Sequence, residues 1–131
     1  MSIPFDTRVL VVDDFESMRR IVGQLLHDMG FRDIALADDG ATALAMLRQD
    51  DFGLLVTDWH MPQMDGIELV RAVRADPRLN PIPILMVSAE ATREQIIEAA
   101  KAGVNDYVVK PFTPQILQAK IGKLFEPPAA R

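Results

Sequence analysis

The sequence predicts an α/β fold in which five strands alternate with five helices, a (βα)5 doubly wound parallel sheet, and three observations support it. Short runs of branched apolar residues alternate with longer segments whose apolar residues repeat at helical spacing. The short runs are apolar at consecutive positions, which is typical of strands covered on both faces. Acidic or turn residues bound these runs. Strands that alternate with helices form parallel sheets, because right-handed crossovers place the helices on the two faces.

The first four elements follow from this alternation. Val9–Val12 is an uninterrupted branched run and is the first predicted strand. The next helix carries six apolar residues between Met18 and Met29 at i, i+3, i+4, i+7, i+8 and i+11, and Gly30 supplies its stop. Ile34–Ala37 is the second strand, and Ala41–Leu47 is the second helix.

The middle of the chain repeats the pattern twice. Leu54–Thr57 is the third strand, and Ile67–Val73 has the spacing of the third helix. Ile84–Val87 is the fourth strand, and Arg93–Ala102 is the fourth helix. Between the second strand and the second helix, Asp38 to Gly40 is interpreted as a turn and a helix cap.

The last strand and helix complete the predicted domain. Tyr107–Val109 is the fifth strand, and Gln115–Phe125 is a helix with apolar residues at helical spacing. We expect one domain over residues 1–131, with a core from about 8 to 125 and an unstructured tail over 127–131. A chain of 131 residues with 49% hydrophobic and 25% charged residues suits one globular core.

Composition excludes several functional classes. The sequence has no cysteine, which removes disulfides, thiolate nucleophiles and cysteine-bound metals. A net charge of −5 disfavours direct binding to nucleic acid. The longest unbroken hydrophobic run, Ala43 to Leu47, is far shorter than the roughly 20 residues that span a bilayer. Without a recognisable signal sequence or membrane segment, the expected location is the cytoplasm.

Polar side chains follow four of the five predicted strands. Asp13 and Asp14 come after the first strand, Asp58 closes the third, Ser88 closes the fourth and Lys110 closes the fifth. The carboxyl ends of parallel strands meet at one edge of the sheet, and this edge is where ligands bind in doubly wound folds. One aspartate alone would fit a turn or a cap equally well, but together these residues predict a site.

Three carboxylates at one edge require a cation. Two carboxylates about 4 Å apart repel by roughly 4 kcal/mol at an effective dielectric constant of about 20. Lys110 supplies one positive charge, and Mg²⁺, which prefers oxygen ligands and keeps open positions for phosphate oxygens, supplies the rest. If Asp58 attacks a phosphoryl donor, Lys110 and the Ser88 hydroxyl are placed to hold the transferring group. The predicted product is an aspartyl phosphate.

Four segments resemble the receiver domains of two-component response regulators, most closely those of single-domain chemotaxis regulators. The segments are Val11–Arg20, Thr57–Gly66, Leu85–Ala91 and Tyr107–Thr113. The resemblance runs from about Arg8 to Phe125. It implies a flavodoxin-like sheet with strand order 2-1-3-4-5.

The resemblance also assigns the site residues. It implies that Asp58 is the phosphoacceptor for a histidine kinase. Mg²⁺ would be held by Asp13, Asp14, Asp58 and the backbone carbonyl of His60. Lys110 would contact the acidic pocket before phosphorylation and the phosphate after it. The peptide bond between Lys110 and Pro111 would be cis.

Signal output follows from the same resemblance. Ser88 and Tyr107 correspond to the switch pair of the family. Other residues are expected to line the pocket: Trp59, Ala89 and Glu90. The expected partner face lies on the fourth helix, fifth strand and fifth helix: Ala91, Arg93, Ile96, Val104, Tyr107 and Lys120.

The resulting hypothesis is a monomeric phosphorylation switch that is not an enzyme. A chemotaxis-type histidine kinase would supply the phosphoryl group, the flagellar motor switch would receive the signal, and a phosphatase is a further possible partner. An alternative is a phosphate sink or adaptor with a non-motor partner. A metal-dependent phosphotransferase is disfavoured, because such enzymes commonly carry an acid two residues after the nucleophile, where this sequence has His60.

Overall fold

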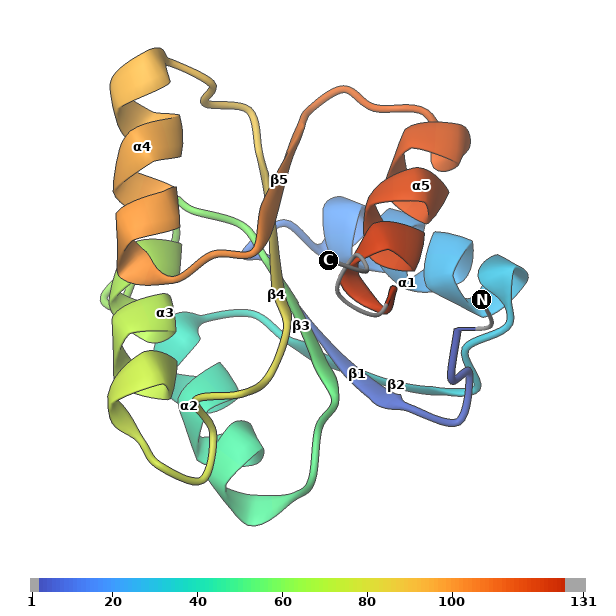
Figure 1. Cartoon of the computed structure of the whole chain (residues 1–131), viewed down its shortest axis with the longest axis horizontal. Coiled ribbons are helices and arrows are strands. Elements are labelled where there is room, and N and C mark those ends of the chain that lie inside the picture. The colour runs from blue at the N-terminus through green and yellow to red at the C-terminus, as the bar shows by residue number, and fades with distance from the viewer. Residues whose placement is uncertain (1–2, 127–131) are drawn as a thin grey trace, which may run out of the picture.

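The computed structural model describes residues 3–126 as one parallel sheet with helices on both faces (Figure 1). The elements are β1 (Arg8–Val12), α1 (Glu16–Met29), β2 (Asp33–Ala37), α2 (Gly40–Gln49), β3 (Leu54–Thr57), α3 (Gly66–Ala75), β4 (Ile84–Ser88), α4 (Arg93–Ala102), β5 (Asp106–Val109) and α5 (Pro114–Leu124). The strand order is β2-β1-β3-β4-β5, and all neighbours are parallel. The predicted (βα)5 flavodoxin-like fold and its 2-1-3-4-5 order are therefore confirmed. The predicted tail, 127–131, lies outside the described residues.

Every predicted element is present, with bounds that differ by at most two residues. The differences fall at helix starts, helix ends and strand ends. At the starts of α2, α3, α4 and α5 the N-cap side chain accepts a hydrogen bond from a first-turn backbone N–H. Asp39 accepts from the Thr42 N–H, which confirms the predicted turn and cap after the second strand. Asp65 and Thr92 form reciprocal capping boxes at the starts of α3 and α4.

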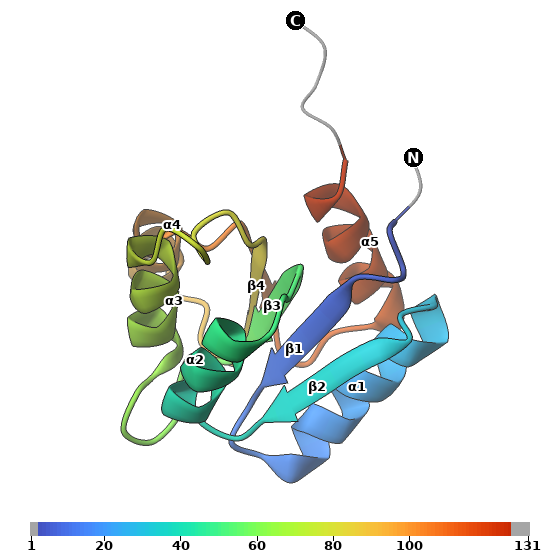
Figure 2. The same ribbon diagram turned by 90° about the horizontal axis from the view of Figure 1, so that it is seen from below.

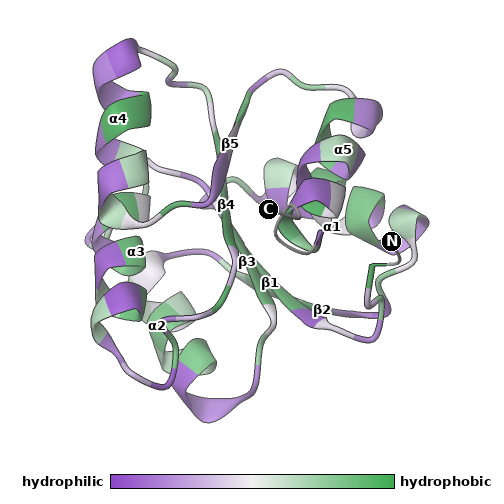
Figure 3. Ribbon diagram, in the orientation of Figure 1, coloured by the Kyte–Doolittle hydropathy of each residue, from purple (hydrophilic) through white to green (hydrophobic). Residues whose placement is uncertain are grey.

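The sheet separates two layers of helices, which Figure 2 shows from a second direction, and an apolar cluster fills the space on each side. Along β1, Val9 and Val11 face the layer of α1 and α5, whereas Leu10 and Val12 face the layer of α2, α3 and α4. Figure 3 shows hydrophobic colouring along the central strands and mixed colouring on the helices. None of the helices in residues 3–126 has the length and apolar character needed to cross a bilayer.

The two edge strands differ from the sequence prediction that every strand is covered on both faces. β1, β3 and β4 are almost completely buried, but β2 and β5 are only partly covered. Leu36 on β2 is 45% exposed, and Val109 on β5 is 40% exposed. Consecutive apolar residues therefore identified the strands but did not distinguish central strands from edge strands.

Arg74, at the end of α3, joins three segments through its guanidinium group. Its Nε and Nη2 donate to the Gly103 carbonyl at 3.0 and 2.7 Å, and its Nη1 donates to the Ile82 carbonyl at 2.7 Å and to the Asn80 carbonyl. Nη2 also donates to Asn105 Oδ1 at 2.8 Å. Gly103 has φ +117°, and a Cβ there would lie 2.7 Å from Arg74 Cγ. This contact ties α3 to the start of β4 and to the α4–β5 loop.

Replacing Arg74 by methionine is expected to lower the free energy of unfolding by about 2 to 3 kcal/mol. The apolar stem is retained, but the carbonyls of Gly103 and Ile82 lose their charged donor. Arg71→Met is the control, since Arg71 lies on the same helix with an exposed side chain 3.7 Å from Glu98, and its loss should cost about 0.5 kcal/mol or less. Urea unfolding measures both variants, and equal losses would contradict a special role for Arg74.

Candidate functional site

The polar residues predicted at the strand ends meet at one edge of the sheet. Asp13 and Asp14 follow β1, and Asp58 follows β3, with one carboxylate oxygen from each residue within 4.8 Å of the others. Lys110 follows β5, and its Nζ lies 3.0 Å from Asp13 Oδ2 and 3.3 Å from Asp58 Oδ2. The Lys110–Pro111 peptide bond is cis, as the family resemblance implied. The arrangement is a cluster of three carboxylates with one ammonium group.

Backbone groups hold the two buried carboxylates in place. Asp13 and Asp58 are buried, whereas Asp14 is exposed. Asp58 Oδ1 accepts from the Trp59 N–H at 2.7 Å, and Asp13 Oδ1 accepts from the Phe15 N–H at 3.0 Å. Phe15 is the N-cap of α1 and has no side-chain cap of its own. The Asp13 side chain therefore serves both the start of α1 and the acidic cluster.

Gly66, the first residue of α3, lets this helix approach the backbone of Asp58. A Cβ at this position would lie 2.1 Å from the Asp58 carbonyl oxygen. The Gly66 N–H donates to the Trp59 carbonyl at 2.7 Å, and the Asp58 N–H donates to the Val12 carbonyl at 2.9 Å. These contacts fix the turn that carries Asp58, and they require a residue without a side chain at position 66.

Burial raises the pKa of the Asp58 carboxyl above its ordinary value of 3.8, and the nearby Asp13 carboxylate adds to this effect. Lys110 and the Trp59 N–H act in the opposite direction, but burial dominates. A raised pKa means that the folded protein binds this proton more tightly than the unfolded chain does. The stability that Asp58 contributes is therefore present at low pH and is lost as the pH rises through the raised pKa.

This sign leads to a prediction for the metal-free protein. In buffer with EDTA, the free energy of unfolding of Asp58→Asn, relative to the unsubstituted protein, should increase as the pH rises from about 4 to about 7. The amide side chain cannot ionise, so the variant avoids the cost of a buried charge. Asp39→Asn is the control of opposite sign, because the Thr42 N–H lowers the pKa of Asp39, so this substitution should lose relative stability as the pH rises to about 4 and change little above it. Urea unfolding at several pH values tests both trends, and parallel profiles for the two variants would contradict the assignment.

Ser88 and Tyr107 both reach the backbone of Glu90, on the loop after β4. The buried Ser88 Oγ accepts from the Glu90 N–H at 3.1 Å, and the Tyr107 hydroxyl donates to the Glu90 carbonyl. The half-buried Tyr107 ring meets Trp59 edge to face, with centroids 6.5 Å apart. Burial raises the pKa of the Tyr107 phenol above its ordinary value of 10.0, so the hydroxyl remains a donor at neutral pH. The two residues of the predicted switch pair thus hold one loop between them.

The predicted pocket-lining residues divide into three environments. The Trp59 ring is buried in the core, and its backbone N–H donates to Asp58 Oδ1. Ala89 is exposed, and Glu90 is partly exposed. His60 lies at the rim, where it stacks on Trp59 with centroids 5.9 Å apart and places Nε2 at 3.6 Å from Glu90 Oε1.

Two contacts at the site were not foreseen from the sequence. One is the His60–Glu90 contact, which joins the loops after β3 and β4. The other is Arg19, whose Nη1 donates to the Asp13 carbonyl at 2.7 Å. The first depends on where two separate loops lie in the folded chain, and the second depends on how the turn between β1 and α1 folds back on itself.

The predicted partner residues lie on α4, β5 and α5 and on the two loops that flank α4, and Figure 1 shows β5 between the helices α4 and α5. Three are exposed and three are partly buried: Ala91, Arg93 and Ile96 in the first group, Val104, Tyr107 and Lys120 in the second. Lys120 Nζ lies 3.0 Å from Asp106 Oδ1. The predicted partner residues therefore lie near one another in the fold, but Lys120 forms an ion pair with Asp106.

The carboxylate cluster fits a magnesium ion. Asp13, Asp14 and Asp58 offer hard oxygen donors within 4.8 Å of one another, and the exposed side of the cluster leaves room for waters or phosphate oxygens. Without a cation, three carboxylates face one ammonium group, so the local charge favours a divalent ion. The backbone carbonyl of His60 as a further ligand stays a prediction.

The family model described as the response regulator receiver domain matches residues 9–122. The chain belongs to this family. As a receiver domain it is 64% identical over 119 residues to the chemotaxis protein CheY of Pseudomonas aeruginosa, covering 91% of this chain and 96% of the relative. It is also 58% identical to CheY-3 of Vibrio cholerae, with 91% and 92% coverage.

Solved structures agree with this CheY-like receiver fold. Vibrio cholerae CheY4 superposes with a TM-score of 0.85 at 35% identity, covering 91% of this chain and 98% of that one. The receiver domain of a Pseudomonas aeruginosa sensor histidine kinase, solved with a magnesium ion coordinated in its active site cleft, superposes with a TM-score of 0.82 at 26% identity, covering 90% and 96%. CheY-like receivers are phosphoacceptor switches rather than conventional enzymes, and receivers bind Mg²⁺ at an acidic pocket.

Proposed function

We propose that this protein is a stand-alone chemotaxis response regulator that accepts a phosphoryl group on Asp58 and signals to the flagellar motor switch. One observation carries the proposal. Lys110 Nζ lies 3.0 Å from Asp13 and 3.3 Å from Asp58, at the edge of the sheet where Asp14 completes a three-carboxylate cluster. This grouping supports phosphoryl transfer to an aspartate.

The chemistry assigns a role to each group. An Asp58 carboxylate oxygen attacks the phosphorus of a phosphohistidine on the kinase, and the phosphorus–nitrogen bond breaks as the phosphorus–oxygen bond forms. Lys110 and the Ser88 hydroxyl stabilise the charge on the phosphoryl oxygens. Bound Mg²⁺, held by Asp13, Asp14 and Asp58, would supply positive charge at those oxygens. The aspartyl phosphate is later hydrolysed at the same site.

Output is proposed to pass through Glu90. In the unphosphorylated protein, Ser88 and Tyr107 both bind the Glu90 backbone. If Ser88 turns toward the phosphoryl group, its bond to the Glu90 N–H is lost, and the loop that leads into α4 is free to rearrange with Tyr107. This links the site to the α4, β5 and α5 face through a small local change.

The proposed setting is chemotaxis in the cytoplasm. The curated relatives are named chemotaxis proteins, and this chain covers 96% and 92% of their lengths, which supports one receiver domain with a core from about 8 to 125. The proposed phosphodonor is a chemotaxis-type histidine kinase, the proposed state is a monomer, and a phosphatase is a further expected partner.

One contact favours a second candidate, a phosphate sink or adaptor with a non-motor partner. Lys120 lies on the proposed output face, but its Nζ is 3.0 Å from Asp106 Oδ1. A motor peptide that uses this ammonium group would have to displace or accommodate the Asp106 carboxylate. A sink requires only the Asp58 chemistry and would tolerate this pair.

Binding of a flagellar motor switch N-terminal peptide distinguishes the two candidates. The peptide is titrated with Mg²⁺ alone and with Mg²⁺ plus beryllofluoride, a phosphoryl mimic at Asp58. Trp59 fluorescence reports pocket filling, because its backbone contacts Asp58 and its ring contacts Tyr107. We expect beryllofluoride to change the fluorescence and to tighten peptide binding by about tenfold or more.

The outcomes separate cleanly. In Asp58→Asn, beryllofluoride should change neither signal. A fluorescence change without tighter peptide binding would favour the sink or adaptor, and no fluorescence change in the unsubstituted protein would contradict the Asp58 assignment itself.

A further inference from the structure

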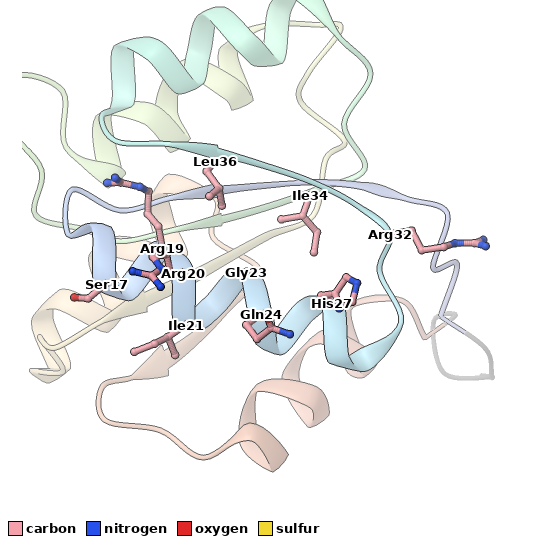
Figure 4. A pocket seen from close by; sticks show the side chains of 10 residues that line it. All are labelled: Ser17, Arg19, Arg20, Ile21, Gly23, Gln24, His27, Arg32, Ile34 and Leu36. Atoms are coloured by element: carbon pink, nitrogen blue, oxygen red, sulfur yellow. The ribbon is translucent and has the colours of Figure 1, made fainter.

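A groove of about 730 Å³ runs between α1 and the edge strand β2 (Figure 4). On α1 it extends from Ser17 to His27, a length of about 15 Å along the helix axis. On the β2 side it extends from Arg32 to Leu36. None of the three aspartates of the cluster lines it. The phosphoacceptor chemistry therefore does not account for this groove.

The groove has an apolar floor. Figure 4 shows Ile34 and Leu36 pointing from β2 toward α1, with Gly23 of α1 between them. Leu36 is 45% exposed, and Ile21 at the rim is 50% exposed. Gly23 is in a helix interior, where glycine costs about 1 kcal/mol relative to alanine. A Cβ there would lie at an ordinary contact distance of 3.6 Å from Leu36 Cδ2, so a side chain longer than that of alanine would extend over the floor.

The arrangement of helices on the two faces of the sheet indicates that the groove fits a helix. Within residues 3–126, three helices cover one face of the sheet and only α1 and α5 cover the other. Figure 2 shows α1 beside β2 with no helix beyond it. A helix lying in the groove would pack on Ile34 and Leu36 and continue this layer past α1, in the way that amphipathic helices bind grooves.

The charged side chains that line the groove indicate that its partner is acidic. Arg19, Arg20, His27 and Arg32 line it, and no aspartate or glutamate does. The whole chain has the opposite balance, with 19 acidic against 14 basic residues. An acidic partner would therefore be attracted to this groove and repelled by much of the remaining surface.

We propose that the α1–β2 groove is a docking site for an acidic amphipathic helix of a partner protein. Apolar side chains of this helix pack on Ile34 and Leu36, and its carboxylates pair with Arg20 and Arg32. The proposal is independent of the α4, β5 and α5 face and of phosphorylation. It gives the protein a second interaction surface at the opposite edge of the sheet.

The probe is a fluorescein-labelled peptide of 15 to 20 residues, long enough to span about 15 Å as a helix, with leucine on one face and glutamate on the other. Binding to the full chain is measured by fluorescence anisotropy, and amide chemical shifts locate the site. We expect saturable binding, with shifts confined to α1 and β2. The same peptide with lysine in place of glutamate should not bind.

Two variants with matched controls test the groove. Gly23→Gln places a side chain over the floor and should weaken binding by about tenfold or more, whereas Gly23→Ala should bind like the unsubstituted protein. The double variant Arg20→Glu with Arg32→Glu should no longer bind the acidic peptide, and salt should then have no effect on the anisotropy. Arg78→Glu, at an exposed position outside the groove, is the charge control and should have little effect.

Folding is checked separately by self-phosphorylation with acetyl phosphate, which all variants should retain. If Gly23→Gln does not fold, the double arginine variant still carries the test. Absence of saturable binding at millimolar peptide, or shifts on α4 and β5 instead, overturns the proposal. If the protein forms a dimer and Gly23→Gln abolishes it, the groove binds a second copy of the chain. If pyrophosphate changes the amide chemical shifts of the groove and the peptide does not, the groove binds a phosphate ligand. Either result would overturn the helix proposal.

Discussion

Asp58→Asn is expected to abolish phosphorylation of the protein by acetyl phosphate and Mg²⁺. The amide is isosteric with the carboxylate but is not a nucleophile toward phosphorus. Lys110, which contacts Asp13 and Asp58, would keep only Asp13 as a charged partner. Intact-mass spectrometry should show one added phosphoryl group on the unsubstituted protein and none on the variant. A rate at least about a thousandfold lower is the expected magnitude, since removal of a nucleophile leaves only weak residual catalysis.

Asp38→Asn is the matched control for this experiment. Asp38 is an exposed aspartate after β2, outside the three-carboxylate cluster. This variant should be phosphorylated at the normal rate. Stoichiometric modification of Asp58→Asn would show that another residue is the acceptor, and loss of modification in both variants would point to a general effect of removing charge.

Gly66→Ala is expected to have the largest effect on stability among single-methyl changes in this chain. The added Cβ would lie 2.1 Å from the Asp58 carbonyl oxygen and 3.0 Å from the Met86 side chain, so the backbone of the β3–α3 turn has to move. Overpacking of this kind costs about 1 to 3 kcal/mol and sometimes more, and here the obstacle is backbone rather than a flexible side chain. Urea unfolding should show a loss of about 3 kcal/mol.

The same substitution should also slow phosphorylation, because the turn that must move carries Asp58. Gly23→Ala is the matched control, since its Cβ would meet only Leu36 Cδ2 at an ordinary contact distance of 3.6 Å. Removing a glycine from a helix interior should leave stability unchanged or raise it by up to about 1 kcal/mol. Equal stabilities for the two alanine variants would mean that the β3–α3 turn tolerates a side chain at position 66.

The sequence determined the fold class and the membership of the acidic cluster. Branched runs such as Val9–Val12 and the apolar stripe from Met18 to Met29 report local periodicity, which depends only on residues within a few positions of one another. Once the strands are parallel, their carboxyl ends share one edge. Asp13, Asp58 and Lys110 are therefore placed on one edge of the sheet, although Asp13 and Lys110 are 97 positions apart in the chain.

The tertiary structure decided which strands lie at the edges and which loops touch. Leu36 has the same apolar character as residues of the central strands, but only its position on β2 leaves it exposed beside α1. The contacts of Arg74 with Gly103, and of Tyr107 with Glu90, likewise join segments whose proximity no local pattern encodes. The physical reason is that periodicity is set by neighbours along the chain. Exposure, hydrogen-bond partners and the charge of a groove are set by neighbours in space, which exist only after the layers have packed.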